Sequence, residues 1–193
     1  ILLLAFLISA RDHGQTPHIM DSLNTSRQAI DTTFSRPYAL IAGGSKGIGS
    51  AILLQQLENN RVFNLSRTKP NLSHPNLTHF PIDVLNDDLP DIAEIDTLIY
   101  CPGTINLKPF SNLSLDNFRQ DFEINVLGAV KVIQNYLPVL KKGFEPSILL
   151  FSTVASKLGM PYHSSIATSK SAVEGLVKSL GAELASEVRI NAI

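Results

Sequence analysis

Hydrophobic residues occur along this chain in short uninterrupted runs, separated by longer segments in which apolar positions recur at helical spacing. Runs of this kind are typical of strands that are buried on both faces, as in a parallel sheet. The pattern predicts six strands, over residues 38–42, 61–65, 78–82, 96–101, 147–151 and 188–193.

The segments between these runs predict helices. The first helix is expected over 46–58 and the last over 164–185. A long helix is expected from Ser114, a favourable N-cap residue, to about residue 142, with an interruption near Pro138. Strands that alternate with helices predict an α/β fold, a doubly wound parallel sheet of Rossmann type with helices on both faces. Ligands of such sheets bind beyond the carboxyl ends of the strands.

The composition excludes several classes of protein. Hydrophobic residues make up 44% of the chain, charged residues 17%, and the net charge is −1. A chain without basic excess is not expected to bind nucleic acid. The single cysteine, Cys101, excludes an internal disulfide and a cysteine-rich zinc site, and the five histidines show no ligand spacing, so no metal is expected. This cysteine usage fits a reducing, cytoplasmic compartment.

The two ends of the chain differ from the middle. The apolar segment 1–10 is shorter than the roughly 20 residues that span a bilayer, so no membrane insertion is expected. Residues 1–35 are interpreted as a poorly defined N-terminal extension. Residues 36–193 are interpreted as an incomplete nucleotide-binding domain whose last strand or strands are missing, because the chain stops inside the strand predicted over 188–193.

A glycine-rich loop carries the strongest chemical signal. Residues 42–49 read Ala-Gly-Gly-Ser-Lys-Gly-Ile-Gly, between the first strand and the first helix. Gly43 permits a tight turn, Gly47 lets the backbone approach a pyrophosphate, and Gly49 lets the helix pack on the sheet. The helix N-terminus offers unpaired N–H groups to phosphates. The loop residues expected to bind a dinucleotide are Gly43, Ser45, Lys46, Gly47, Ile48 and Gly49.

The end of the second strand predicts which nicotinamide cofactor is preferred. An NAD enzyme usually has a carboxylate there, which accepts a hydrogen bond from the ribose 2′-hydroxyl. This chain instead has Ser66 and Arg67. Arg67 can bind a 2′-phosphate with two N–H groups, Ser66 can donate a hydrogen bond to it, and Lys46 can add a second cation. The sequence therefore predicts NADP(H) as the cofactor in preference to NAD(H).

The spacing Gly-x-x-x-Gly-x-Gly of this loop resembles that of the short-chain dehydrogenase/reductase family, and the resemblance extends over residues 38–193. Further matches follow in chain order at Asp83-Val84, Asp96, Gly103, Asn125, Lys170 and the segment 188–191. In the family, the position of Asp83 and Val84 holds the adenine, and the position of Gly103 lets the chain pass close to the cofactor. Ala42 departs from the threonine usual in the family.

The resemblance implies an oxidoreductase with a Ser–Tyr–Lys site and an Asn that holds a relay water. Lys170 matches the lysine, Asn125 the asparagine, and Thr153 stands at the serine position. The tyrosine position, four residues before Lys170, holds Ile166, which has no proton to transfer. The implied substrate is a small molecule with a carbonyl/alcohol pair or an activated C=C bond.

Three explanations for Ile166 remain open. Another group supplies the proton: His163 lies seven residues before Lys170, within about 20° of the same helix face, and matches a tyrosine used by some enoyl reductases of the family. Tyr162 is the other candidate. Alternatively, water or the substrate takes that role, or the protein binds NADP(H) without turnover, as a redox sensor or a partner subunit. The helices predicted over 114–142 and 164–185 match the family's dimer faces, which implies a homo-oligomer for the full-length protein.

Overall fold

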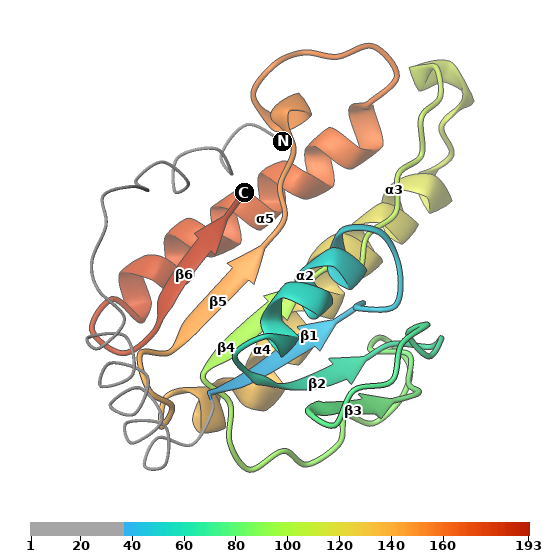
Figure 1. The fold of residues 1–193 in the computed structure, drawn as a ribbon. Coiled ribbons are helices and arrows are strands. Elements are labelled where there is room, and N and C mark those ends of the chain that lie inside the picture. The colour runs from blue at the N-terminus through green and yellow to red at the C-terminus, as the bar shows by residue number, and fades with distance from the viewer. Residues whose placement is uncertain (1–36) are drawn as a thin grey trace, which may run out of the picture. The chain divides into compact units, whose positions relative to one another are not determined.

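The structure, a computed structural model, describes residues 37–193. Six parallel strands form the centre of this part of the chain (Figure 1). The extension expected over 1–35 lies outside these residues. The sheet order is β3-β2-β1-β4-β5-β6, and every neighbouring pair is parallel. The strands are β1 Tyr38–Ala42, β2 Arg61–Leu65, β3 Leu77–Phe80, β4 Thr97–Tyr100, β5 Ser147–Leu150 and β6 Arg189–Ala192. The predicted α/β fold is confirmed.

Helices cover both faces of this sheet. Figure 1 shows α2 on one face and α4 on the opposite face. The core on the α2 side contains Ile41, Leu53 and Val62, and the core on the other side joins the sheet to α4 and α5. The helices are α2 Gly47–Leu57, η1 Phe110–Asn112, α3 Leu115–Phe122, η2 Glu123–Leu127, α4 Gly128–Leu140, η3 Val154–Ser156 and α5 Ser164–Glu183.

The long helix predicted from Ser114 does begin there, since the Ser114 side chain caps α3. The interruption expected near Pro138 is wrong, because α4 continues through this residue to Leu140. A proline this close to the end of a helix removes only one late hydrogen bond. The helix instead changes to a π-helical turn, η2, at Glu123–Leu127. There the Asn125 side chain donates to the carbonyl of Asp121, four residues earlier, at 2.8 Å. Such turns occur often at functional sites.

The strand order places a candidate site. The neighbours of β1 are β2 on one side and β4 on the other. The chain therefore builds the sheet outward from β1 through β2 and β3, and then in the opposite direction through β4, β5 and β6. A crevice forms beyond the carboxyl ends of the strands where the order reverses in this way. Among the described helices, none has the length and apolarity needed to cross a bilayer. The described His, Cys, Asp and Glu residues form no group of three able to hold a metal ion.

Candidate functional site

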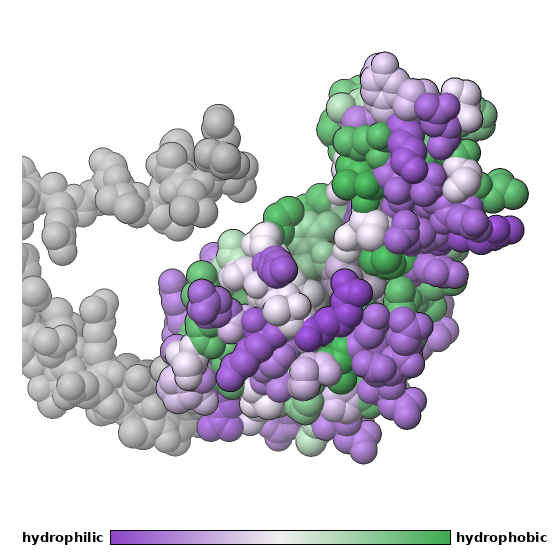
Figure 2. Space-filling view, turned by 90° about the vertical axis from the view of Figure 1, so that its right-hand side faces the viewer, coloured by the Kyte–Doolittle hydropathy of each residue, from purple (hydrophilic) through white to green (hydrophobic). Residues whose placement is uncertain are grey.

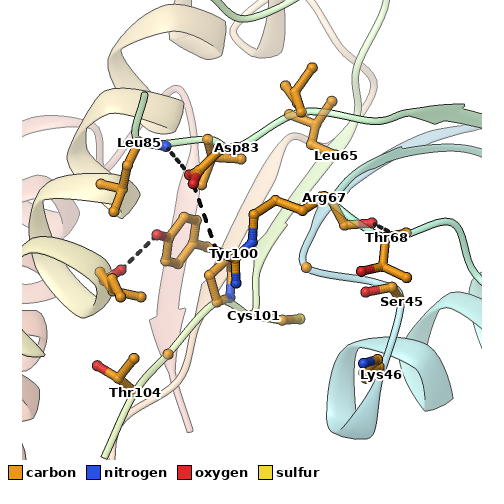
Figure 3. A pocket seen from close by; sticks show the side chains of 17 residues that line it. Ser45, Lys46, Leu65, Arg67, Thr68, Asp83, Leu85, Tyr100, Cys101 and Thr104 are labelled. Atoms are coloured by element: carbon orange, nitrogen blue, oxygen red, sulfur yellow. Dashed lines mark hydrogen bonds and ion pairs between the residues drawn. The ribbon is translucent and has the colours of Figure 1, made fainter. Parts of the chain in front are cut away.

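A cleft of about 390 Å³ opens beyond the carboxyl ends of β1, β2 and β4 (Figure 3). It brings together eight of the residues that the sequence predicted to bind the cofactor. These are Gly43, Ser45, Lys46, Ser66, Arg67, Asp83, Val84 and Gly103. The other predicted residues do not line this cleft. The cleft therefore collects the phosphate and adenine part of the predicted site from four separate loops.

The glycine loop follows the end of β1 and turns into α2. Gly43 has φ +79° and Gly47 has φ +57°, both in the left-handed region that favours glycine. A Cβ atom on Gly49 would overlap the carbonyl oxygen of Gly43, so only glycine lets the first turn of α2 lie against the loop. Lys46 is the N-cap residue of α2 with an extended backbone and is exposed. The arrangement presents the N-terminus of α2 to the cleft, which suits an anion.

Asn64 holds this loop in place, and the sequence reasoning missed it. This residue is fully buried in β2. Its Oδ1 atom accepts a hydrogen bond from the backbone N–H of Gly44 at 2.9 Å, and its Nδ2 atom donates to Ser66 Oγ at 2.8 Å and contacts His79 Nδ1 at 3.0 Å. A polar residue inside an otherwise apolar buried strand was the available signal, because such residues need partners. Ser66 Oγ itself donates to the carbonyl of Thr68 at 2.9 Å.

Arg67 reaches over the mouth of the cleft (Figure 3). Its side chain is 81% exposed, and one guanidinium nitrogen lies 3.9 Å from Asp83 Oδ2. The other oxygen of Asp83 accepts a hydrogen bond from the backbone N–H of Leu85 at 3.0 Å. Asp83 thus lies beside the guanidinium at the cleft. A guanidinium has five N–H donors, so donors remain for an anionic ligand.

Asn125 and Lys170 meet beside Gly103. Asn125 is 2% exposed, and its Nδ2 atom also donates to the carbonyl of Thr104 at 3.2 Å. Its Oδ1 atom is buried without a hydrogen-bond partner. A Cβ atom on Gly103 would lie 3.0 Å from Asn125 Oδ1 and 3.9 Å from Lys170 Nζ. An unpaired buried acceptor next to an ammonium group suits a bound water or ligand hydroxyl.

Lys170 donates from Nζ to the carbonyl of Phe151 at 2.8 Å. Burial lowers the pKa of Lys170, while the nearby Asp121 and Cys101 raise it. Burial also raises the pKa of the Cys101 thiol to about 12, so this cysteine is not a nucleophile at neutral pH.

Thr153 and Ile166 occupy the other two positions of the site implied by the resemblance. Thr153 Oγ1 accepts a hydrogen bond from the backbone N–H of Ala155 at 3.3 Å and caps η3. Ile166, on α5, is only 4% exposed. The position at which the family has a tyrosine is therefore a packed aliphatic side chain.

His163 and Tyr162 lie at the start of α5, outside the cleft. His163 is the N-cap residue of this helix, and its Nδ1 atom lies 2.7 Å from the carbonyl oxygen of Pro161. Nδ1 must carry a proton to donate to that carbonyl, which leaves Nε2 as the atom that can exchange a proton. Tyr162 has φ +70° and is 58% exposed.

The sequence also matches known proteins. Residues 85–193, more than half of the chain, match the family model described as Enoyl-(Acyl carrier protein) reductase. The chain is 35% identical to the uncharacterized oxidoreductase YusZ of Bacillus subtilis (strain 168) over 92 residues, which are 48% of this chain and 33% of that protein. L-xylulose reductase of Mesocricetus auratus is 26% identical over 168 residues, which are 80% of this chain and 69% of that protein.

Solved structures share the fold. The ligand-free aldohexose dehydrogenase of Thermoplasma acidophilum is similar with a TM-score of 0.72 and 27% identity, over 81% of this chain and 65% of that chain. The matched region thus spans a third of the length of the first curated relative and about two thirds of the other two proteins.

Proposed function

This chain belongs to the short-chain dehydrogenase/reductase family, and on that premise we propose that the protein is an NADP(H)-dependent oxidoreductase. Its substrate is a small molecule with a carbonyl/alcohol pair or an activated C=C bond. The nicotinamide cofactor supplies or takes the hydride when it is bound. A cytoplasmic compartment and a homo-oligomeric assembly remain predictions from the sequence.

One observation carries this proposal. The glycine loop and Arg67 line one cleft, while Gly103 connects that cleft to the buried, unpaired Oδ1 atom of Asn125 and to Lys170. The residues present therefore fit a dinucleotide. The N-terminus of α2 would hold its pyrophosphate, Arg67 and Lys46 its 2′-phosphate, and Asp83 and Val84 its adenine.

The side chains beyond Gly103, which do not line the cleft itself, have separate tasks. Lys170 binds the ribose hydroxyls of the nicotinamide nucleoside, and Asn125 Oδ1 accepts a hydrogen bond from a relay water. Thr153 orients the substrate oxygen through its hydroxyl. His163 transfers the proton from Nε2, and Tyr162 is the alternative donor. Ile166 is buried on α5 and takes no part in proton transfer.

The cofactor preference is tested by titrating the intact protein with NADPH and NADH and following the nucleotide fluorescence. The parent is expected to bind NADPH more tightly than NADH. Arg67→Ala removes a charge-assisted contact, so the Kd for NADPH should rise about tenfold or more while the Kd for NADH changes little. Lys69→Ala is the matched control, because this nearby cation does not line the cleft. Equal affinity of the parent for the two nucleotides would refute the NADP(H) preference.

The catalytic assignment is tested by turnover. NADPH oxidation by the intact protein is measured against panels of carbonyl and enoyl substrates, with His163→Ala and Tyr162→Phe beside the parent. Loss of a proton donor is expected to slow turnover by about 10²–10⁴-fold. Full activity in both variants would refute both donors. Tight NADPH binding without turnover on any substrate would instead favour a nucleotide-binding module.

A further inference from the structure

The inner end of the site contains a buried carboxylate that none of the assigned roles uses. Asp121 lies on α3, one helical turn before Asn125, and is 0% exposed. Its Oδ1 atom accepts hydrogen bonds from Thr104 Oγ1 at 2.8 Å and from Asn106 Nδ2 at 3.0 Å. Its Oδ2 atom accepts one from Ser165 Oγ at 2.6 Å. Both oxygens of this buried group are thus hydrogen-bonded.

A fully buried carboxylate is costly unless its charge is compensated. No Lys or Arg forms an ion pair with Asp121 among the described residues. The three side-chain hydrogen bonds compensate it, and they come from segments far from α3 in the sequence. Ser165 lies 44 residues away and Thr104 lies 17 residues away. These hydrogen bonds therefore tie α3 to the loop after β4 and to the start of α5.

Each of the three segments that meet at Asp121 carries part of the site. Thr104 follows Gly103, beside which Asn125 Oδ1 and Lys170 Nζ meet. The backbone carbonyl of Asp121 also accepts a hydrogen bond from Asn125 Nδ2 at 2.8 Å. Both the side chain and the backbone of Asp121 therefore contact residues of the site. Ser165 lies in the first turn of α5, the helix that carries Lys170 about one and a half turns later.

We propose that Asp121 is a positioning residue for this active site. Its carboxylate holds the loop after β4 and the first turn of α5 against α3, and this junction sets where Asn125 Oδ1 and Lys170 Nζ lie beside Gly103. The inference rests on the proposed function, because it assigns Asp121 to the site that binds the nicotinamide end of the cofactor.

The charge of Asp121 adds a second effect that a structural junction alone would lack. The titratable groups that act on Lys170 are Asp121 on α3 and the Cys101 thiol after β4. Burial lowers the pKa of Lys170 and the carboxylate of Asp121 opposes this, so Asp121 favours the ammonium form that binds ribose hydroxyls. Removal of that charge lowers the pKa of Lys170 further. As the pH rises, the variant should therefore lose the ammonium form, and with it nucleotide binding, at a lower pH than the parent.

The test compares Asp121→Asn with two other variants of the intact protein. Asp121→Asn removes the charge at nearly constant volume. Ser165→Ala removes one hydrogen bond and leaves the charge. Asp116→Asn is the matched control, because Asp116 lies on the same helix but is exposed and pairs with Arg119 at 2.7 Å. The Kd for NADPH is measured between pH 6 and 10, and amide hydrogen exchange is followed over 103–106 and 164–170.

Asp121→Asn is expected to raise the Kd for NADPH about tenfold at neutral pH, as for a lost hydrogen bond to a charged group, and to move the alkaline loss of binding to lower pH. Ser165→Ala should speed hydrogen exchange at the start of α5 without moving that pH. Asp116→Asn should match the parent in every measurement.

A folded Asp121→Asn protein with the parent's Kd, pH dependence and hydrogen exchange would overturn the proposal. If Asp121→Asn does not fold, unchanged Kd and exchange in both Ser165→Ala and Thr104→Val would overturn it. A parent that binds no NADPH would refute the proposed function instead. In that case faster exchange at 103–106 and 164–170 in Asp121→Asn, compared with Asp116→Asn, would still support the junction, and equal exchange would refute it.

Discussion

Close contacts limit which residues can replace the glycines of the loop. A Cβ atom on Gly44 would lie 2.5 Å from Asn64 Oδ1, and one on Gly49 would overlap the carbonyl oxygen of Gly43. A Cβ atom on Gly47 would meet nothing within 4 Å, so at that position only the positive φ favours glycine. Close packing requires glycine at Gly44 and Gly49, whereas backbone conformation favours it at Gly47.

Gly49→Ala is therefore expected to destabilise the protein by about 1–3 kcal/mol or more, as overpacking does, and to weaken NADPH binding by displacing the loop. Urea unfolding gives the first quantity and nucleotide titration the second. Gly175→Ala is the control, because a Cβ atom there meets nothing within 4 Å and the residue lies inside α5. It should stabilise the protein by about 0.5–1 kcal/mol. Equal stability of Gly49→Ala and the parent would contradict this account.

Ile166 stands at the position where the family has a tyrosine. It lies four residues before Lys170 on α5, so the two side chains share a helix face. Ile166→Tyr should create or raise NADPH-dependent carbonyl reduction, since a positioned proton donor contributes about 10²–10⁴-fold. Ile166→Phe adds the ring without the hydroxyl and serves as the control. A folded Ile166→Tyr protein no more active than Ile166→Phe would show that the hydroxyl does not reach the substrate oxygen.

Among the elements, the short turn η3 depends on α5 for its position. Ser152 Oγ donates to Glu174 Oε1 at 2.6 Å, and Ser156 Oγ donates to the same oxygen. These two hydrogen bonds fasten both ends of the segment that carries Thr153. They also lower the pKa of Glu174, with smaller contributions from neighbouring charges.

This arrangement predicts a pH dependence of stability. A carboxyl whose pKa is lower in the folded than in the unfolded protein stabilises the folded state at pH values above its unfolded pKa, which is about 4.3 for Glu. This stabilisation is lost as the pH falls through the pKa of the folded state. Thermal unfolding measured between pH 2.5 and 7 should therefore give a higher Tm for the parent than for Glu174→Gln at neutral pH. The two Tm values should converge as the pH falls. A constant difference between the curves at every pH would exclude the carboxylate as the cause.

Two hydrophobic cores on opposite faces hold the sheet between helices. Leu40 is fully buried in β1, at the centre of the sheet. The surface in Figure 2 is largely hydrophilic, with hydrophobic side chains among hydrophilic ones at its upper end. Exposed apolar residues of the loop after β4 and the start of α3 are Ile105, Leu107, Phe110 and Leu115.

Leu40→Ala should accordingly lower the free energy of unfolding by about 2–5 kcal/mol, through lost transfer free energy and the cavity that remains. Leu54→Ala is the control, because Leu54 is 55% exposed on α2 and its truncation leaves no cavity. Denaturant unfolding of both variants measures the difference. A loss below 1 kcal/mol for Leu40→Ala would contradict a close-packed sheet centre.

Much of the fold was predictable from the sequence because its signals are local. The expected strands 38–42 and 61–65 have the observed bounds, and each of the other four differs by one or two residues at one or both ends. Apolar runs and glycine positions are properties of consecutive residues. The π-helical turn at Glu123–Leu127 was not predictable in this way, because it accompanies side-chain contacts of Asn125 with Asp121 and Thr104.

Local patterns in the sequence specify the alternation of strands and helices, the glycine loop at the start of α2 and the presence of Arg67 in place of a carboxylate. Tertiary structure determines which polar side chains meet. It joined Asn64 to Gly44, Arg67 to Asp83, and Asp121 to Ser165, pairs that lie 16 to 44 residues apart. Hydrophobic periodicity records only which face of an element is buried. The partner of a buried polar atom depends on how whole elements pack, and so it follows from the assembled sheet and helices.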